Sequence, residues 1–451
     1  MQLFEHQRKA LEQTEGQNKV AYYLDMGLGK TFVGAEKMVQ LGEDVNLVIC
    51  QKSKIQDWID HFKEHYGDFP FCFEICDLTN KKQLEKFFQH IQEAKGELLD
   101  PRQFVGVINY DLIWRRKALR NLENFTLMLD ESSLIQNETN KRSKFIMKMK
   151  PSNVILLSGT PTSGKYENLW SQIHLLGWNI SQDTYNKQYV NWKKIDVGGF
   201  PKKIVDREDP YKNVDRLKSK LREHGAVFMK TEECFDLPDQ NFITVNYGSS
   251  KEYRKFKKNS IIKIDTLNLK EYKDCSDFYG VDVTPWVELV GDTRLTKMMY
   301  SRMLCGQYSQ EKLEGFMDLV ESTQDRLIVF YNFKEEVRRL INIANACERP
   351  WSIVSGDEKN LAVYEEHDNS ITFIQYQAGA MGLNLQKSNK IIYFTPPLMS
   401  ELFEQSKKRI HRIGQDKACF YYMMVCKDTI EEEILQTLEM RKDFTDELFK
   451  E

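Results

Sequence analysis

One short segment near the N-terminus limits the folds open to this chain more than any other. The stretch Leu-Asp-Met-Gly-Leu-Gly-Lys-Thr begins at Leu24, directly after an apolar run and before an amphipathic one. Gly27 and Gly29 let backbone N–H groups approach phosphate oxygens, and the N-terminus of a following helix favours an anion. In such a loop Lys30 contacts the outer phosphates and Thr31 ligates magnesium. The general pattern has a glycine where Leu24 stands, so the alternative is a glycine turn that caps a core helix.

Apolar runs alternate along the chain with amphipathic stretches, which is typical of parallel α/β units. The pattern is interrupted near Leu237-Pro238, so the sequence predicts an α/β fold with two tandem parallel sheets. We expect an N-terminal lobe over 1–236 and a C-terminal lobe over 237–451, with small insertions. The expected strands are Val20–Leu24, Asn46–Cys50, Phe104–Ile108, Thr126–Leu129, Val154–Leu157, Leu327–Phe330, Ser352–Val354, Ile371–Ile374, Ile391–Phe394 and Tyr421–Cys426.

Two stretches depart from this alternation. Residues from about 179 to 221 are polar and aromatic, and Gly198-Gly199 between two strand-like runs indicates a hairpin. Pro201 would restrict the second run to an edge. Residues from about 249 to 315 have a mainly helical pattern.

Length, charge and cysteine usage indicate how many domains the chain has and exclude several classes of protein. A chain of 451 residues suits two or three domains, and no apolar run approaches the roughly 20 residues of a membrane-spanning helix. The N-terminus lacks the pattern of a secretory signal. The nine cysteines form no CxxC pair, and no histidine cluster accompanies the closest two, Cys72 and Cys76, so we expect reduced thiols and a cytoplasmic protein. A net charge of −3 argues against a globally basic binder but leaves room for a local basic track.

An acidic pair, Asp130-Glu131, ends the predicted strand Thr126–Leu129. At the end of a strand downstream of a phosphate loop, Asp130 suits magnesium coordination and Glu131 suits water activation. Such a pair also occurs as the charged cap of a helix, which is the alternative here.

Two further groups of polar residues follow strands or open helices. Ser158 and Thr160 lie in a hydroxyl-rich turn after the next strand, where they could sense the acidic pair and its metal; an ordinary turn is the alternative. Arg409 and Arg412 are three residues apart, so we expect them on one helix face. Arginine suits the charge that develops on a transferring phosphoryl group, although a solvated basic helix has the same pattern.

Taken in order, these segments resemble the motifs of superfamily 2 helicases of the Swi/Snf-type branch. The resemblance spans nearly the whole chain, and Arg-Ile-Gly-Gln, which ends at Gln415, is its most branch-specific string. The matching segments are Phe4–Gln7 (glutamine motif), Asp25–Thr31 (motif I), Leu129–Asn137 (motif II), Leu157–Thr162 (motif III), Phe228–Lys230 with Asp236–Pro238 (lobe junction), Ala378–Leu385 (motif V) and Gln405–Gln415 (motif VI).

This resemblance implies two RecA-like lobes with an ATP cleft between them, and ATP and Mg²⁺ as cofactors. It implies that Gln7 reads adenine, that Gly382 also contacts the nucleotide, and that Gln405 belongs with Ser158 and Thr160 to the residues that couple hydrolysis to movement. Lys30, Glu131, Arg409 and Arg412 are then the expected catalytic residues.

The chain departs from the family pattern at two places and in its size. Ser132-Ser133 stand where the family usually has Ala-His, which puts the usual histidine link between ATP and motif III in doubt. Gln377 stands where an arginine is frequent. The compact chain is similar to phage or bacterial members, including phage helicases that act on forks and migrate branches; a phage protein would work in the host cytoplasm.

The resemblance also implies a DNA track, for which Lys52, Ser53, Asn109 and Tyr110 are candidates after two of the strands. Contacts of this kind are made to phosphates and are independent of base sequence. An ordinary loop role is the alternative for each residue.

The predicted hairpin adds a second set of candidate DNA contacts. We hypothesise that lysines of both arms hold phosphates while the aromatic ring of Phe200 stacks on a base, so that the hairpin separates strands. A plain surface hairpin is the alternative. The lysines concerned are Lys193, Lys194, Lys202 and Lys203.

We therefore expect an ATP-hydrolysing DNA helicase, acting as a monomer on forked or branched DNA in replication or recombination. The alternatives are a double-stranded DNA translocase that displaces protein without separating strands, and a nucleotide switch without motor activity. The intact acidic pair and arginine pair argue against the switch.

Overall fold

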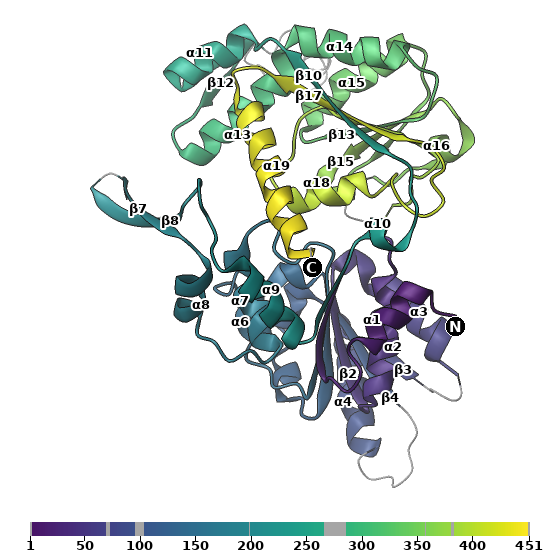
Figure 1. Ribbon diagram of the computed structural model, residues 1–451. Helices are drawn as coiled ribbons and strands as arrows, with labels where there is room; N and C mark the ends of the chain where they lie inside the picture. Colours follow the sequence, from purple (N-terminus) through teal and green to yellow (C-terminus); the bar gives the residue numbers. More distant parts are fainter. Residues whose placement is uncertain are drawn as a thin grey trace. The chain divides into compact units, whose positions relative to one another are not determined.

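The protein consists of two compact units (Figure 1). The computed structural model describes residues 2–68, 73–94, 103–197, 199–265, 286–356, 358–379 and 383–449. The first unit comprises Met1–Asp236 and Arg441–Glu451, and the second comprises Leu237–Met440. The first break thus falls next to Leu237-Pro238, but the segment from Arg441 onward, which we expected in the second lobe, groups with the first.

The first unit is built on a sheet whose seven described strands all run parallel to their neighbours. Their spatial order is β3-β4-β2-β5-β6-β1-β9. All five strands predicted here are confirmed, whereas β3 and β9 were not anticipated. The strands are β1 (Lys19–Leu24), β2 (Val45–Cys50), β3 (Phe73–Asp77), β4 (Gln103–Asn109), β5 (Phe125–Asp130), β6 (Asn153–Leu157) and β9 (Ala226–Met229).

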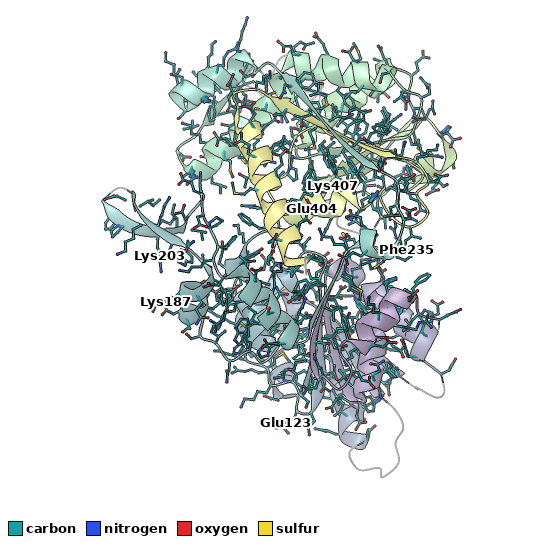
Figure 2. All side chains as sticks on the ribbon, viewed as in Figure 1. Glu123, Lys187, Lys203, Phe235, Glu404 and Lys407 are labelled. Atoms are coloured by element: carbon teal, nitrogen blue, oxygen red, sulfur yellow. The ribbon has the colours of Figure 1, made fainter. Side chains whose placement is uncertain are left out.

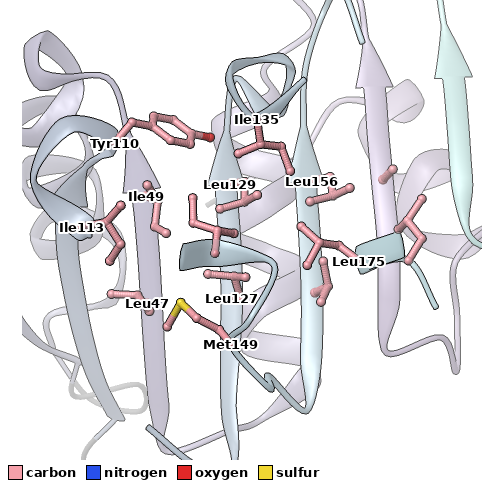
Figure 3. Packing of buried hydrophobic residues seen from close by; sticks show 14 of the residues in the cluster. Leu47, Ile49, Tyr110, Ile113, Leu127, Leu129, Ile135, Met149, Leu156 and Leu175 are labelled. Atoms are coloured by element: carbon pink, nitrogen blue, oxygen red, sulfur yellow. The ribbon is translucent and has the colours of Figure 1, made fainter. Parts of the chain in front are cut away.

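Helices cover both faces of this sheet, and each face has its own apolar cluster. Successive strand residues point to opposite faces, so Leu127 and Leu129 join one cluster while Met128 joins the other. Figure 3 shows the first of these faces, where Leu127 and Leu129 pack beside Leu47 and Ile49. The helices are α1 (Glu5–Glu12), α2 (Lys30–Leu41), α3 (Ile55–Tyr66), α4 (Lys81–Ala94), α5 (Tyr110–Ile113), α6 (Lys141–Ile146), α7 (Trp170–Leu175), α8 (Gln182–Tyr189), α9 (Val214–Glu223) and α10 (Thr231–Cys234), with short 3₁₀ turns η1 (Lys52–Lys54), η2 (Lys117–Asn121), η3 (Ser132–Ile135) and η4 (Tyr166–Leu169).

The second unit contains a second parallel sheet, in the order β10-β17-β16-β13-β15-β14. The five strands predicted here are confirmed, and β10 was missed because most of its side chains are exposed or half-buried. The strands are β10 (Gln240–Tyr247), β13 (Leu327–Tyr331), β14 (Trp351–Val354), β15 (Ile371–Gln375), β16 (Lys390–Tyr393) and β17 (Cys419–Cys426). The helices are α11 (Lys251–Asn259), α13 (Arg294–Tyr308), α14 (Gln310–Glu321), α15 (Lys334–Ala346), α16 (Ala362–Glu366), α17 (Tyr376–Gly379), α18 (Ser400–Lys407) and α19 (Ile430–Phe449).

Two antiparallel strand pairs stand apart from the main sheets. The hairpin predicted in the first unit is present as β7 (Trp192–Val197) and β8 (Phe200–Val205). In the second unit, β11 (Ile261–Asp265) pairs with β12 (Trp286–Val290). Within 249–315 the described residues form α11, α13 and the start of α14 together with the strands β11 and β12, so the prediction of a mainly helical stretch missed this strand pair. Residues 266–285 lie outside the described ranges.

Helix α19 contributes to both units. Its first half supplies Ile434 and Leu438 to a core cluster of the second unit, and its end supplies Leu448 and Phe449 to the core of the first. Although α19 has 20 residues, neither it nor another helix in the described ranges is apolar enough over such a length to cross a membrane.

Candidate functional site

The predicted phosphate loop connects β1 to α2 in the first unit. Gly27 and Gly29 have φ values of 92° and 73°, a region that glycine enters without steric cost. Gly29 is the N-cap of α2, and Lys30 opens the helix. The Lys30 ammonium folds back over the loop and donates to the carbonyl oxygen of Leu24 at 3.1 Å. The loop therefore places a cation and a helix N-terminus beside each other, which suits an anionic ligand.

Gln7 of α1 lies against this loop. Its Nε2 donates to the Leu28 carbonyl at 3.2 Å, and its Oε1 accepts from the Phe4 backbone N–H at 3.0 Å. A Cβ atom at Gly29 would collide with Nε2 of Gln7, so close packing as well as backbone conformation requires glycine there. The side chain keeps one N–H and one lone pair for a ligand, which leaves the expected contact with adenine chemically open.

Asp130 is the last residue of β5 and Glu131 follows it; β5 is separated from β1 only by β6. The carboxyl ends of these parallel strands meet at one edge of the sheet, where ligands of open α/β sheets bind. The Asp130 carboxylate accepts a hydrogen bond of 2.9 Å from the indole of Trp58. Burial raises the pKa of Asp130, while the Trp58 hydrogen bond and Lys30 act to lower it. A divalent cation at this edge would offset the desolvation of that carboxylate.

Glu131 has a left-handed backbone conformation, with φ 55° and ψ 60°. Such a conformation costs a non-glycine residue roughly 1–2 kcal/mol, so it needs support from its neighbours. Tyr110 supplies this support, because its hydroxyl donates to the carbonyl oxygens of Asp130 at 2.9 Å and Glu131 at 3.3 Å.

The four candidate DNA contacts near this edge differ in exposure. Tyr110 and Asn109 are 2% and 4% exposed, so both side chains are packed inside the unit, and their contact with DNA phosphates stays a prediction that this burial does not favour. Lys52 and Ser53 lie exposed in η1, directly after β2.

The hydroxyl-rich turn after β6 lies close to the phosphate loop. A Cβ atom at Gly159 would be 3.3 Å from Nζ of Lys30, so the turn passes directly beside the ammonium. Ser158 and Thr160 are buried, and the Ser158 hydroxyl accepts from the Thr160 backbone N–H at 3.1 Å.

A residue that the sequence did not single out joins this turn to the acidic pair. Gln172 of α7 is fully buried, and its Oε1 accepts from the Ser132 hydroxyl at 2.7 Å and from the Tyr23 hydroxyl at 3.1 Å. Its Nε2 donates to the Pro161 carbonyl at 2.7 Å. Ser132-Ser133 stand where the family usually has the histidine that connects this region to motif III. Here the side chain of Gln172 connects Ser132 to the turn at Pro161 instead. Neither Gln172 nor Trp58 gave a sequence signal, because an isolated glutamine or tryptophan in an amphipathic stretch has no defined role.

In the second unit, Arg409 and Arg412 do not share a helix face as we expected. Helix α18 ends at Lys407, and both arginines lie in the turns that follow it. The side chain of Gln415 holds these turns, because its Nε2 donates to the carbonyl oxygens of Gln386, Ser388 and Ile410 at 2.9–3.1 Å. Burial lowers the pKa of the Arg412 guanidinium.

Two further residues of the second unit, Gln405 and Gly382, were predicted to belong to the site. Gln405 is buried on α18 and donates to Glu401 at 3.4 Å. Gly382 lies outside the described residues.

The predicted residues of the hairpin lie on β7 and β8, away from the phosphate loop. Phe200 is 78% exposed, and the side chains of Lys193, Lys194, Lys202 and Lys203 are all exposed.

The chain is similar to a known protein family and to several known proteins. A family profile described as "SNF2-related domain" matches residues 21–283. The human "SWI/SNF-related matrix-associated actin-dependent regulator of chromatin subfamily A member 1" is 24% identical, over 92% of this chain and 40% of the relative. The Bacillus subtilis "Putative ATP-dependent helicase/translocase YwqA" is 22% identical, over 94% of this chain and 46% of the relative. The chain thus spans less than half the length of these two relatives.

A solved structure is also similar to the chain over nearly its whole length. It is described as "Sulfolobus solfataricus SWI2/SNF2 ATPase core in complex with dsDNA", and it is 18% identical, with a TM-score of 0.43, over 99% of this chain and 92% of that chain.

Proposed function

We propose that this chain, which belongs to the SNF2-related domain family, is an ATP hydrolase that uses the energy of hydrolysis to move on DNA. The observation that carries the proposal is the convergence of three segments at one edge of the first sheet. The phosphate loop, the pair Asp130-Glu131 and the turn from Ser158 lie at the carboxyl ends of the strands β1, β5 and β6, which follow one another in the sheet as β5-β6-β1.

The first unit has suitable groups for each part of ATP hydrolysis. Lys30 and the amides at the start of α2 bind the outer phosphates. Thr31 and Asp130 would hold Mg²⁺, since a hydroxyl and a carboxylate are the oxygen ligands that this ion prefers. The ion would neutralise charge on the phosphates. Glu131, held in its strained conformation by Tyr110, orients and deprotonates the attacking water.

Several further assignments rest on the family pattern. Gln7 would contact adenine, Gly382 would contact the nucleotide, and Gln405 with Ser158 and Thr160 would couple hydrolysis to movement. Arg409 and Arg412 are the proposed residues that stabilise the transferring phosphoryl group.

Lys52 and Ser53 remain the proposed DNA contacts of the first unit. Their exposure directly after β2 supports this role. We propose forked or branched DNA as the substrate, with strand separation as the outcome. The name of the Bacillus relative covers both a helicase and a translocase, so translocation on duplex DNA without strand separation is the second candidate.

Two assays test the proposed ATP hydrolysis and the proposed strand separation separately. ATP hydrolysis should be stimulated by DNA and abolished in Lys30→Ala and in Glu131→Gln; retained turnover in both variants would refute the assigned chemistry. Unwinding of a fork, measured beside displacement of a triplex strand from plain duplex, then distinguishes a helicase from a duplex translocase.

A further inference from the structure

The β7–β8 hairpin has two faces of different character. In its register, Ile195 lies opposite Lys202 and Val197 lies opposite Phe200, so the side chains of Ile195, Lys202 and Phe200 share one face. Phe200 is 78% exposed and Ile195 is 38% exposed. Figure 1 shows the hairpin extending beyond the helices of the first unit, so the exposed side chains of Ile195 and Phe200, with Lys202 on the same face, are presented on an arm.

The opposite face carries a close pair of like charges. Lys194 lies directly opposite Lys203, an arrangement that disfavours the hairpin unless an anion lies between the two ammonium groups. Figure 2 labels Lys203 on the hairpin. Its Nζ lies 5.1 Å from the ring centroid of Trp192, which holds this lysine on the face. Asp196 also lies on this face, and its Oδ1 accepts from the turn N–H of Gly199 at 2.7 Å. Among the described residues, neither lysine of the pair forms an ion pair.

Lys193 behaves differently from these lysines. Its ammonium lies 2.9 Å from Asp206 and 3.6 Å from Glu208. The hydrogen bond to Asp206 raises the pKa of Lys193. We had expected Lys193 among the DNA contacts, but its charge is already balanced at the base of the arm.

The base of the arm is fixed in the first unit. The Asn191 N–H donates to the Pro210 carbonyl at 2.9 Å, and the Asp206 N–H donates to the Asn191 carbonyl at 2.9 Å. Just below, Tyr211 stacks on the buried ring of Tyr166 with centroids 4.3 Å apart. A load on the tip is therefore transmitted to the core of the unit rather than absorbed by a loose loop.

We infer that this arm engages the single-strand/double-strand junction of DNA and separates the strands. One phosphate backbone lies over Lys194 and Lys203, while Phe200 stacks on the first unpaired base and blocks its return to the duplex. Phosphate supplies the anion that the lysine pair needs, and every base offers a face to an aromatic ring. The inference rests on the proposed function, because only an ATP-driven motor would push the junction against the arm.

The test compares Phe200→Ala with Phe200→Trp on a fork carrying a fluorescent base analogue at the junction. Stacking should change the fluorescence on binding without ATP, and Phe200→Ala should lose that change while Phe200→Trp keeps it. Base pairs separated per ATP hydrolysed should fall about tenfold in Phe200→Ala, given the contribution of stacking to binding. Lys187→Ala on α8 is the control, since that exposed lysine is paired with Asp183 and lies off the arm.

A second variant tests the lysine face. Lys194→Ala/Lys203→Ala should weaken fork binding and reduce the slope of log K against log salt by about two, whereas Lys193→Ala should change the slope less.

The outcomes separate the inference from the proposed function. An unchanged fluorescence signal and an unchanged unwinding yield in Phe200→Ala would overturn the arm's role, even if DNA-stimulated hydrolysis is intact. Wild-type protein that hydrolyses no ATP would overturn the proposed function, and the ATP-independent fluorescence and salt measurements would still decide whether the arm binds the junction.

Discussion

The side chains of Ser132 and Gln172 form a buried hydrogen bond of 2.7 Å, from the serine hydroxyl to Oε1 of the glutamine. The amide nitrogen of the same glutamine donates to the Pro161 carbonyl, so one side chain connects the acidic strand end to the hydroxyl-rich turn. If the segment of Ser132 or the turn at Pro161 moves, Gln172 must therefore move with it or lose one of these two hydrogen bonds.

Gln172→Ala should weaken this connection. Loss of the amide leaves the Ser132 hydroxyl and the Pro161 carbonyl buried without this partner, which costs about 1–3 kcal/mol of stability. Misplacement of the two segments should also lower DNA-stimulated ATP hydrolysis roughly 10- to 100-fold. Chemical unfolding and an ATPase assay measure the two effects. The control is Gln56→Ala, which removes an exposed amide. Unchanged hydrolysis in Gln172→Ala would show that the link has no part in the reaction.

His61 should make the protein sensitive to acid. Its ring lies 4.9 Å from Phe32 and 4.8 Å from His65, and burial, aided by His65, lowers its pKa to about 4. The unfolded chain, with a histidine pKa of about 6.5, binds this proton more readily than the folded chain does. The contribution of neutral His61 is therefore complete above pH ~6.5 and is lost as the pH falls toward 4, at no more than about 1.4 kcal/mol per pH unit.

Urea unfolding at several pH values between 4 and 7 checks this prediction. His61→Gln should flatten the pH dependence, whereas His174→Gln, at an exposed histidine of the same unit, should leave it as in the wild type. A wild-type slope in His61→Gln would mean that other groups cause the acid sensitivity.

Gly164→Ala should detach the end of α19 from the first unit. A Cβ atom at Gly164 would lie 2.6 Å from the Arg441 Cα, and its φ of 71° is itself unfavourable for alanine. Gly16 has the same φ but no atom within 4 Å of such a Cβ, so Gly16→Ala controls for backbone strain alone. Hydrogen exchange at the amides of residues 441–449 should accelerate in Gly164→Ala and stay slow in Gly16→Ala. Equal exchange in the two variants would contradict the packing argument.

Removing one partner of a buried ion pair should strongly destabilise the second unit. Lys312 and Glu431 have side chains that are 0% and 1% exposed, and Nζ lies 2.8 Å from both carboxylate oxygens. Lys312→Met leaves the Glu431 charge buried without its counter-ion, which should cost about 3–5 kcal/mol. Adding Glu431→Leu should recover much of that loss. Removing one partner of the exposed Lys187–Asp183 pair should change stability by no more than about 1 kcal/mol. Calorimetric unfolding of these variants measures the changes in stability and checks the prediction.

The sequence predicted both sheets because their central strands are short, nearly continuous apolar runs between polar turns. That signal fails for β10, whose side chains are largely outside the core, and for β9, which has only four residues. The hairpin was predictable because Gly198-Gly199 is a local turn signal that needs no tertiary information.

The candidate site was predictable only where chemistry lies in consecutive residues. The phosphate loop and the acidic pair are local patterns, and parallel strand order then brings them to one edge. Trp58 and Gln172 reach the site from helices whose packing no local pattern specifies. The two arginines were assigned to a helix because three-residue spacing fits one, but the turns held by Gln415 decide their conformation.

The course of α19 has a consequence for the order in which the protein can fold. The first unit takes Leu448 and Phe449 into its core, and the Tyr166 hydroxyl donates to the Phe444 carbonyl at 2.8 Å. During synthesis, residues 1–236 emerge long before these partners do, so the first unit must wait for the whole second unit to be translated before it is complete. In a nascent chain stalled after residue 236, side chains that these partners cover, such as Tyr166, would therefore be exposed to solvent and to chaperones.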